Sequence, residues 1–284
     1  MKLIDLHVHT TRSDGTLTPA KTVELAAELG LAAVAITDHD TVAGIAEAAQ
    51  TGKKLGVELV TGVEMSTGWE HHEIHLLGYL FDPASPELVP ALEWVINDRR
   101  ERNEKMAALM RADGLPVWAR ELYAKYPRST VGRPHFAVKL MELGLASSVQ
   151  DAFARYLNPG EKYYIRRHFI PFDEAAAILR AAGGVPVLAH PLQYKLGGEE
   201  LRCLMSYCRH IGVQGMECLY SGYTTAQEKE LTALAEEYGF AVTGGSDFHG
   251  SHKPDIHMGS GRGALRVPYE LLEKLKNIKT AGAL

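Results

Sequence analysis

Short apolar runs alternate with amphipathic stretches along the first eighty residues of the chain. The apolar runs predict strands at 3–8, 33–37, 57–63 and 75–80. A helix is expected after the first strand, because Thr18-Pro19 is typical of an N-cap followed by a proline in the first turn, and Gly30 supplies a stop. A second helix over 41–55 then separates the second strand from the third.

The pattern changes in the middle of the chain. From Pro86 to about Ile170 the strand signal disappears, and helical stretches are predicted at 87–113, 119–126, 133–143 and 149–157. The alternation resumes after Pro171, with a helix to Ala182 and then strands at 185–189, 214–218 and 240–243. Strands that alternate with helices favour a parallel sheet. Seven strands are close to the eight of a TIM barrel, so the sequence predicts an α/β barrel over 1–85 and 171–284, interrupted by a helical insertion over 86–170.

Composition excludes several classes of protein. Of the 284 residues, 46% are hydrophobic and 23% are charged, which excludes a disordered, collagen-like or coiled-coil chain. Three cysteines without C-x-x-C spacing argue against a disulfide framework or a zinc ribbon. The longest apolar stretch, 31–36, is too short to span a bilayer, and no targeting signal is recognisable. We therefore expect a cytoplasmic protein with no membrane association and no obligate protein partner.

Charge is distributed unevenly along the chain. The net charge is −5, which argues against a globally basic nucleic-acid binder. Between Arg99 and His168, however, the chain contains 14 Lys and Arg and only 7 Asp and Glu. The rest of the chain contains 16 basic and 28 acidic residues. Widening the window to 86–170 reduces the excess to +4 without changing its sign. A basic insertion beside an acidic barrel suits a small anionic substrate held between them.

Histidine is unusually frequent, with thirteen in the chain. Acidic and histidine side chains follow or lie on successive predicted strands: His7 and His9, Asp14, Asp38-His39-Asp40, Glu64, His75, His190, and Asp247 with His249. Each taken singly has an ordinary structural explanation, such as a helix cap, a turn or a packed histidine. Together they cluster where an α/β barrel builds its active site, at the C-terminal ends of its strands. Six imidazoles and three of these carboxylates already exceed the needs of one ion and suit two or three divalent ions.

These motifs resemble, in order, those of the PHP (polymerase and histidinol phosphatase) family of the amidohydrolase superfamily. The resemblance implies a distorted seven-stranded barrel and a set of metal ligands. One ion would be held by His7, His9, Glu64 and Asp247, with Glu64 bridging to a second ion that His75 and His190 also bind. A third would be held by Asp14, His39 and His249. Mn²⁺ is the first expectation, with Zn²⁺, Fe²⁺ or Mg²⁺ as alternatives.

A motif in the predicted insertion resembles that of one subgroup of this family. Val131-Gly132-Arg133-Pro134-His135-Phe136 is similar to the subgroup that dephosphorylates 3′,5′-nucleotide bisphosphates, which also includes 5′-to-3′ exoribonucleases. His135 and Lys139 share a helix face and could bind one phosphate, to which Arg133 could add a bidentate contact; a solvated basic helix is the alternative. Tyr220 and Ser221 are further candidates for contacts to a base or sugar, with packing as the alternative.

The resemblance implies metal-assisted hydrolysis of the 3′-phosphate of a nucleoside 3′,5′-bisphosphate. The residues expected to take part in catalysis are Asp14, His39, His190, Asp247, His249 and Arg133. His190, His249 or a group near Asp247 could protonate the leaving oxygen. Three alternatives remain: an exoribonuclease on short RNA, a histidinol-phosphate phosphatase, and a PHP module that binds without turnover.

Overall fold

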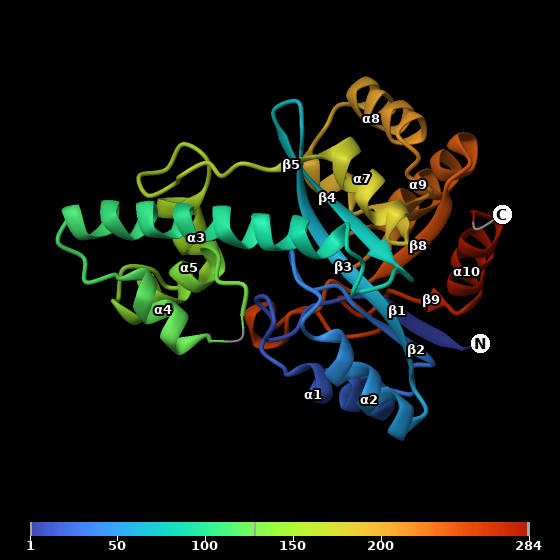
Figure 1. Ribbon diagram of the computed structural model, residues 1–284, viewed down its shortest axis with the longest axis horizontal. Helices are drawn as coiled ribbons and strands as arrows, with labels where there is room; N and C mark the ends of the chain where they lie inside the picture. Colours follow the sequence, from blue (N-terminus) through green and yellow to red (C-terminus); the bar gives the residue numbers. More distant parts are fainter. Residues whose placement is uncertain (1, 128, 283–284) are drawn as a thin grey trace. The chain divides into compact units, whose positions relative to one another are not determined.

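The computed structural model describes residues 2–127 and 129–282, which form two compact units. The first unit contains the described residues up to Ala91 and from Phe169 onwards, and the second is Leu92–His168. Figure 1 shows the course of the chain through both.

The first unit is built on one sheet that combines nine strands in the described residues. They are β1 (Leu3–Val8), β2 (Ala33–Ile36), β3 (Glu58–Trp69), β4 (His72–Tyr79), β5 (Ile170–Pro171), β6 (Val185–Leu188), β7 (Gly215–Tyr220), β8 (Ala241–Gly245) and β9 (Val267–Pro268). Their order is β8-β7-β6-β4-β3-β2-β1-β9, with β5 beside β3. A parallel bridge from Val8 to Phe248, just beyond β8, brings the last long strand next to the first. The sheet is therefore nearly closed, as in a barrel.

All seven predicted strands are present, but the count of seven and the wholly parallel sheet need correction. The two additional strands, β5 and β9, have two residues each, which is too short to produce a recognisable pattern. β4 runs antiparallel to both β3 and β6. The reason is the connection: only Glu70 and His71 separate β3 from β4, which allows a hairpin but not the long crossover that a parallel pair requires.

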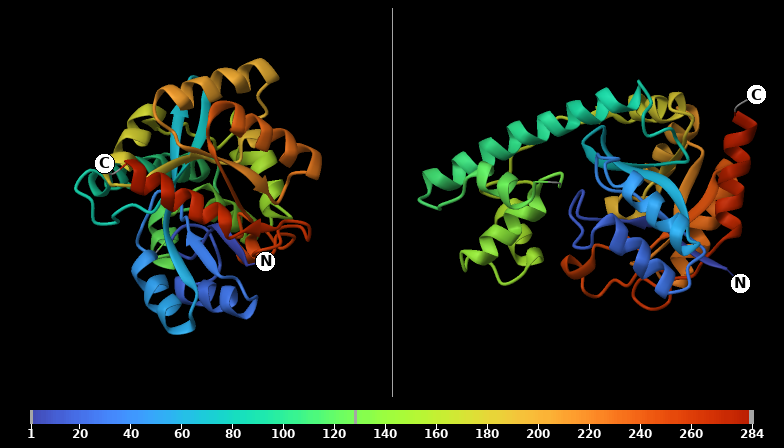
Figure 2. Two further views of the ribbon diagram at one scale, coloured as in Figure 1. Left: turned by 90° about the vertical axis from the view of Figure 1, so that its right-hand side faces the viewer. Right: turned by 60° about the horizontal axis from the view of Figure 1, so that its bottom comes forward.

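Among the described residues, the α-helices that lie wholly within this unit are α1 (Pro19–Glu28), α2 (Ile45–Leu55), α7 (Phe172–Ala181), α8 (Gly198–His210), α9 (Thr225–Tyr238) and α10 (Glu270–Gly282). Thr18 caps α1 with its side chain and Pro19 opens the helix, as predicted. α1 and α2 pack side by side, and α7, α9 and α10 cover strands of the sheet, as Figure 2 shows from two further directions. The strands contribute fully buried side chains such as Leu6, Leu77 and Val187 to the core beneath α10.

The second unit is helical and has its own core. It contains most of α3 (Leu88–Ala112), together with α4 (Ala119–Lys125), α5 (Arg133–Glu142), α6 (Val149–Ala152) and a π-helical turn, η1 (Phe153–Leu157). Met106, Met110, Phe136 and Leu140 are fully buried in one apolar cluster. This separate core explains why the residues fold as a compact unit. Among the described residues of the whole chain, no helix is long and apolar enough to cross a membrane.

Candidate metal centre

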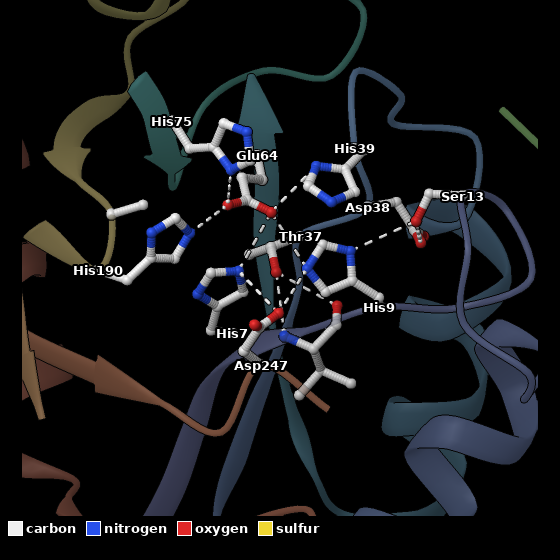
Figure 3. Close-up of polar contacts among 12 residues, drawn as sticks. His7, His9, Ser13, Thr37, Asp38, His39, Glu64, His75, His190 and Asp247 are labelled. Carbon is white, nitrogen blue, oxygen red and sulfur yellow. Dashed lines mark hydrogen bonds and ion pairs between the residues drawn. The ribbon is translucent and has the colours of Figure 1, made fainter. Parts of the chain in front are cut away.

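One edge of the sheet in the first unit gathers the nine side chains that the sequence nominated as metal ligands. His7 lies on β1 and His9 follows it; His39 follows β2, and His190 follows β6. The others come from β3, β4 and the segments after β1 and β8: Asp14, Glu64, His75, Asp247 and His249. Figure 3 shows seven of the nine labelled, with the carboxylate of Glu64 among the imidazoles.

Glu64 is the central carboxylate of the cluster, and its side chain is almost fully buried. Its Oε1 lies 2.8 Å from Nδ1 of His75 and 2.9 Å from Nε2 of His190. Its Oε2 lies 3.3, 3.2 and 3.1 Å from one nitrogen of each of three further histidines: His7, His9 and His39. Both oxygens of one carboxylate are thus surrounded by imidazoles, an arrangement suited to a ligand that bridges two ions.

Asp14 and Asp247 complete the cluster on its other sides. Asp14 Oδ1 is 3.3 Å from Nε2 of His249, and Asp14 Oδ2 is 4.0 Å from Nε2 of His39. Asp247 Oδ1 is 3.3 Å from Nε2 of His9. In the described residues, four overlapping sets have donor atoms close enough for one ion: His9-Asp14-His39-His249, His7-Glu64-His190, His7-His9-Asp247 and His39-Glu64-His75.

Two of these residues lie at positions in their strands that differ from those predicted from the sequence. Glu64 and His75 were expected at a strand end and on a parallel fourth strand, but Glu64 lies in the middle of β3, which continues to Trp69. His75 lies in the first half of β4. Because β4 is antiparallel to β3, its first half lies beside the second half of β3, and Ser66 pairs with His75. Strand reversal therefore delivers His75 to the same edge as the ends of the parallel strands.

The donor set fits divalent metal ions. Nε2 of His7, Nε2 of His9 and Nδ1 of His39 are buried and make no hydrogen bond within the described chain. Nδ1 of His7 lies 2.9 Å from Oε1 of Glu217, and Nδ1 of His249 lies 2.8 Å from the carbonyl oxygen of Asp247. Since these oxygens only accept, both Nδ1 atoms carry the hydrogen, and in the neutral form of each ring, which is the form that binds metal, Nε2 directs a lone pair towards the cluster. Buried nitrogens without hydrogen bonds beside carboxylate oxygens are what metal coordination requires.

The pKa values in the cluster indicate that its carboxylates are stabilised in the ionised form by neighbouring positive charge. Burial alone would raise the pKa of Glu64, but the surrounding histidines hold this pKa well below its ordinary value, and the same is true of Asp14. Burial lowers the pKa of His9, yet Asp247 and Glu64 outweigh it and raise the pKa to about 9. Burial lowers the pKa of His39 to about 3, so this imidazole is neutral. Divalent cations can supply the positive charge that protonated histidines otherwise provide.

Two buried carboxylates that support the cluster were not identified as such from the sequence. Glu217, on β7, accepts hydrogen bonds from His7 and from the backbone N–H of His190, at 2.9 Å each. Asp38 accepts bonds of 2.7 Å from the hydroxyls of Thr10 and Ser13, and so braces the loop that leads to Asp14. A glutamate flanked by buried apolar residues inside a strand was the available signal for Glu217.

Glu217→Gln should weaken metal binding by about 10–100-fold, because it removes the carboxylate that fixes the ring orientation and tautomer of His7. Competition with a chromophoric chelator measures the affinity, and circular dichroism verifies the fold. Glu200→Gln is the matched control, since Glu200 pairs with His72 at 3.1 Å outside the cluster. Equal affinities for Glu217→Gln and the unmodified protein would contradict this role.

The five residues that the sequence nominated for substrate contacts are divided between the two units. The Tyr220 hydroxyl donates to Asp247 Oδ2, and the Ser221 hydroxyl donates to the Ser246 carbonyl, so both hydroxyls have partners inside the first unit. The other three belong to the second unit: Arg133, His135 and Lys139.

Within the second unit, these three side chains differ in exposure. Arg133 is half-buried and stacks its guanidinium over the rings of Phe153 and Tyr164. His135 is buried, and its Nδ1 accepts the backbone N–H of Gly132 at 3.1 Å. Lys139 is half-buried. Their role in binding substrate stays a prediction.

Comparisons with known proteins agree with this geometry. A model of the PHP domain matches residues 5–132. A 5′-3′ exoribonuclease of Haemophilus influenzae is 36% identical over 248 residues, covering 87% of this chain and 90% of that protein. A 3′,5′-nucleoside bisphosphate phosphatase of Chromobacterium violaceum is 32% identical over 256 residues, covering 88% of each. A solved structure from Bifidobacterium adolescentis, described as a metal-dependent phosphoesterase, matches with a TM-score of 0.85 and 32% identity over 96% of this chain and 95% of that one.

A barrel-like sheet with clustered imidazoles and carboxylates at one edge, together with these relatives, defines a metal-dependent phosphoesterase. The chain belongs to the PHP family, and the resemblance inferred from its motifs is confirmed.

Proposed function

We propose that this protein removes the 3′-phosphate from nucleoside 3′,5′-bisphosphates, giving a nucleoside 5′-monophosphate and inorganic phosphate. The observation that carries the proposal is the cluster around Glu64, in which four overlapping sets of donors meet at one edge of the sheet. The relative from Chromobacterium violaceum, named for this activity, supports the choice of substrate. Mn²⁺ is the first ion to test.

The residues of the cluster would hold metal ions and would also supply a proton to the leaving group. Glu64, Asp14 and Asp247 would bind two or three divalent ions together with the six histidines. When bound, such ions lower the pKa of water from about 15.7 towards about 7 and so supply hydroxide at neutral pH. The leaving 3′ oxygen needs a proton, for which His190, His249 and Asp247 remain the candidates. Six of the nine side chains are buried, which limits the access of bulk water to them and strengthens the charge interactions among them.

We propose Arg133, His135 and Lys139 as contacts to the substrate's phosphates, with Arg133 supplying a planar, bidentate donor. Its stacking on Phe153 and Tyr164 restricts the orientation of the guanidinium, which reduces the entropy lost on binding. We also propose Tyr220 and Ser221 as residues near the substrate, although their hydroxyls already have protein partners. Substitution of Arg133 should therefore raise KM more than substitution of Ser221.

Phosphate release by the Mn²⁺-loaded protein tests the proposal. We expect adenosine 3′,5′-bisphosphate to be hydrolysed at least about tenfold faster, in kcat/KM, than adenosine 5′-monophosphate, because the 5′-phosphate supplies binding energy remote from the reacting bond. Chromatography should show adenosine 5′-monophosphate as the product. Equal rates for the two nucleotides, or loss of the 5′-phosphate, would overturn the proposal.

A 5′-to-3′ exoribonuclease is the second candidate, favoured by the relative from Haemophilus influenzae. A dinucleotide with a 5′-phosphate distinguishes the two, because an exoribonuclease cleaves it to mononucleotides without releasing inorganic phosphate. Histidinol phosphate added to the same screen tests the third alternative. A protein that binds Mn²⁺ but turns over none of these substrates would support a non-catalytic module.

A further inference from the structure

The two oxygens of Asp247 have different surroundings. Oδ1 faces the metal cluster, at 3.3 Å from His9 Nε2 and 3.7 Å from His7 Nε2. Oδ2 accepts two hydrogen bonds of 2.7 Å, one from the hydroxyl of Tyr220 and one from the ammonium group of Lys253. Within the described chain no histidine forms an ion pair with Oδ2, whereas both oxygens of Glu64 and of Asp14 face imidazoles.

We propose that Lys253 and Tyr220 are positioning residues that keep Asp247 a monodentate metal ligand by occupying Oδ2. A carboxylate can otherwise bind one ion through both oxygens. For Asp247 this would break two hydrogen bonds, one of them charge-assisted, which makes the bidentate mode unfavourable. The coordination position left open is then available to substrate or water.

The fold holds both donors firmly in place. Tyr220 is the last residue of β7. This strand pairs with β8, which ends shortly before Asp247. The side chain of Tyr220 is buried. Lys253 follows a short 3-10 turn, η3 (Gly250–His252), and its backbone N–H bonds to the carbonyl of Gly250. The imidazole of His252 in this turn lies 2.7 Å from the carbonyl of Asp14, which ties the turn to the loop of another ligand.

The backbone of Asp247 points to the same constraint. Its φ of 57° lies in the left-handed region, which is unfavourable for a non-glycine residue and persists only where the surroundings enforce it. The bonds to Oδ2 and the backbone bond from Asp247 N–H to the His7 carbonyl, 2.8 Å, are such surroundings. The carboxylate is thus fixed at both its backbone and its outer oxygen.

The inference rests on the metal centre of the proposed function, so its test uses a readout that does not need turnover. Co²⁺ bound to the full-length protein gives visible d–d absorption whose intensity falls as the coordination number rises. In Lys253→Met and in Tyr220→Phe, Oδ2 loses one of its two hydrogen bonds, so its approach to the ion becomes less costly. We expect a loss of d–d intensity in both variants and its recovery in Lys253→Arg. With phosphate monoester substrates, kcat should fall by about 10–100-fold.

The chain offers a matched control at the start of β3. Glu58 accepts bonds of 2.6 Å from Lys276 and from the hydroxyl of Tyr269. A carboxylate, a lysine and a tyrosine therefore meet here as they do at Asp247, but this carboxylate is not a candidate metal ligand. Lys276→Met and Tyr269→Phe should leave the Co²⁺ spectrum unchanged. If Lys253→Met does not fold, Tyr220→Phe alone decides. Co²⁺ spectra of Lys253→Met and Tyr220→Phe identical to that of the unmodified protein would overturn the inference. A normal Co²⁺ spectrum in a protein that hydrolyses no phosphate ester would contradict the proposed function instead.

Discussion

Glu64→Gln should lose nearly all phosphoesterase activity and most of its bound metal. The substitution preserves the shape of the side chain but removes the charge that five histidines surround. Removing one partner of a buried charge interaction typically costs about 3–5 kcal/mol. Since about 1.4 kcal/mol corresponds to a factor of ten, a loss of this size in metal binding should reduce phosphate release on the order of 10²–10⁴-fold. Elemental analysis and phosphate release on the same preparation measure both effects.

Glu58→Gln is the control for this substitution, because Glu58 lies on the same strand, far along it from the cluster, and pairs with Lys276. It should cost some stability and leave activity and metal content intact. Full metal content and activity in Glu64→Gln would show that Glu64 is not the central ligand.

Removing bound metal should lower the melting temperature on the order of 10 °C. An ion that binds only the folded protein stabilises it by about 4 kcal/mol when present at a thousand times its Kd. For a chain of this size about 1 kcal/mol shifts the melting temperature by about 2–4 °C. Differential scanning fluorimetry in EDTA, followed by stepwise addition of Mn²⁺, measures the shift.

The Glu64→Gln variant provides the comparison for the melting experiment, because a protein with an impaired cluster should gain less from Mn²⁺. A melting temperature that responds to neither EDTA nor Mn²⁺ in the unmodified protein would mean that the cluster does not hold ions. A response of equal size in Glu64→Gln would place the stabilising ion elsewhere.

Much of the fold could be predicted because its signals are local. The seven longer strands and the N-terminal cap of α1 follow from apolar runs and from Thr18-Pro19. The reversal of β4 could not be read from strand patterns, because it depends on the two-residue connection after Trp69. The strands β5 and β9 pair through two residues each, so their existence depends on neighbours that the rest of the fold provides.

The residues that gather in the candidate site could be predicted from the sequence, whereas the residues that hydrogen-bond to them could not. Histidines and carboxylates at successive strand ends form a pattern that a sequence displays directly. Glu217, Asp38 and Lys253 form hydrogen bonds to residues of the cluster or to the loop before Asp14, and nothing in their neighbours along the chain indicates those partners. Contacts between residues far apart in sequence, such as that of Glu217 with His7, appear only when the strands are assembled.

The central claim is that this edge of the sheet holds divalent ions. Anomalous diffraction from crystals of the full-length protein grown with Mn²⁺ tests it most directly. We predict two or more anomalous peaks within coordination distance of Glu64, Asp14 and Asp247. Peaks confined to other parts of the molecule, or no peak at full Mn²⁺ saturation, would contradict the claim.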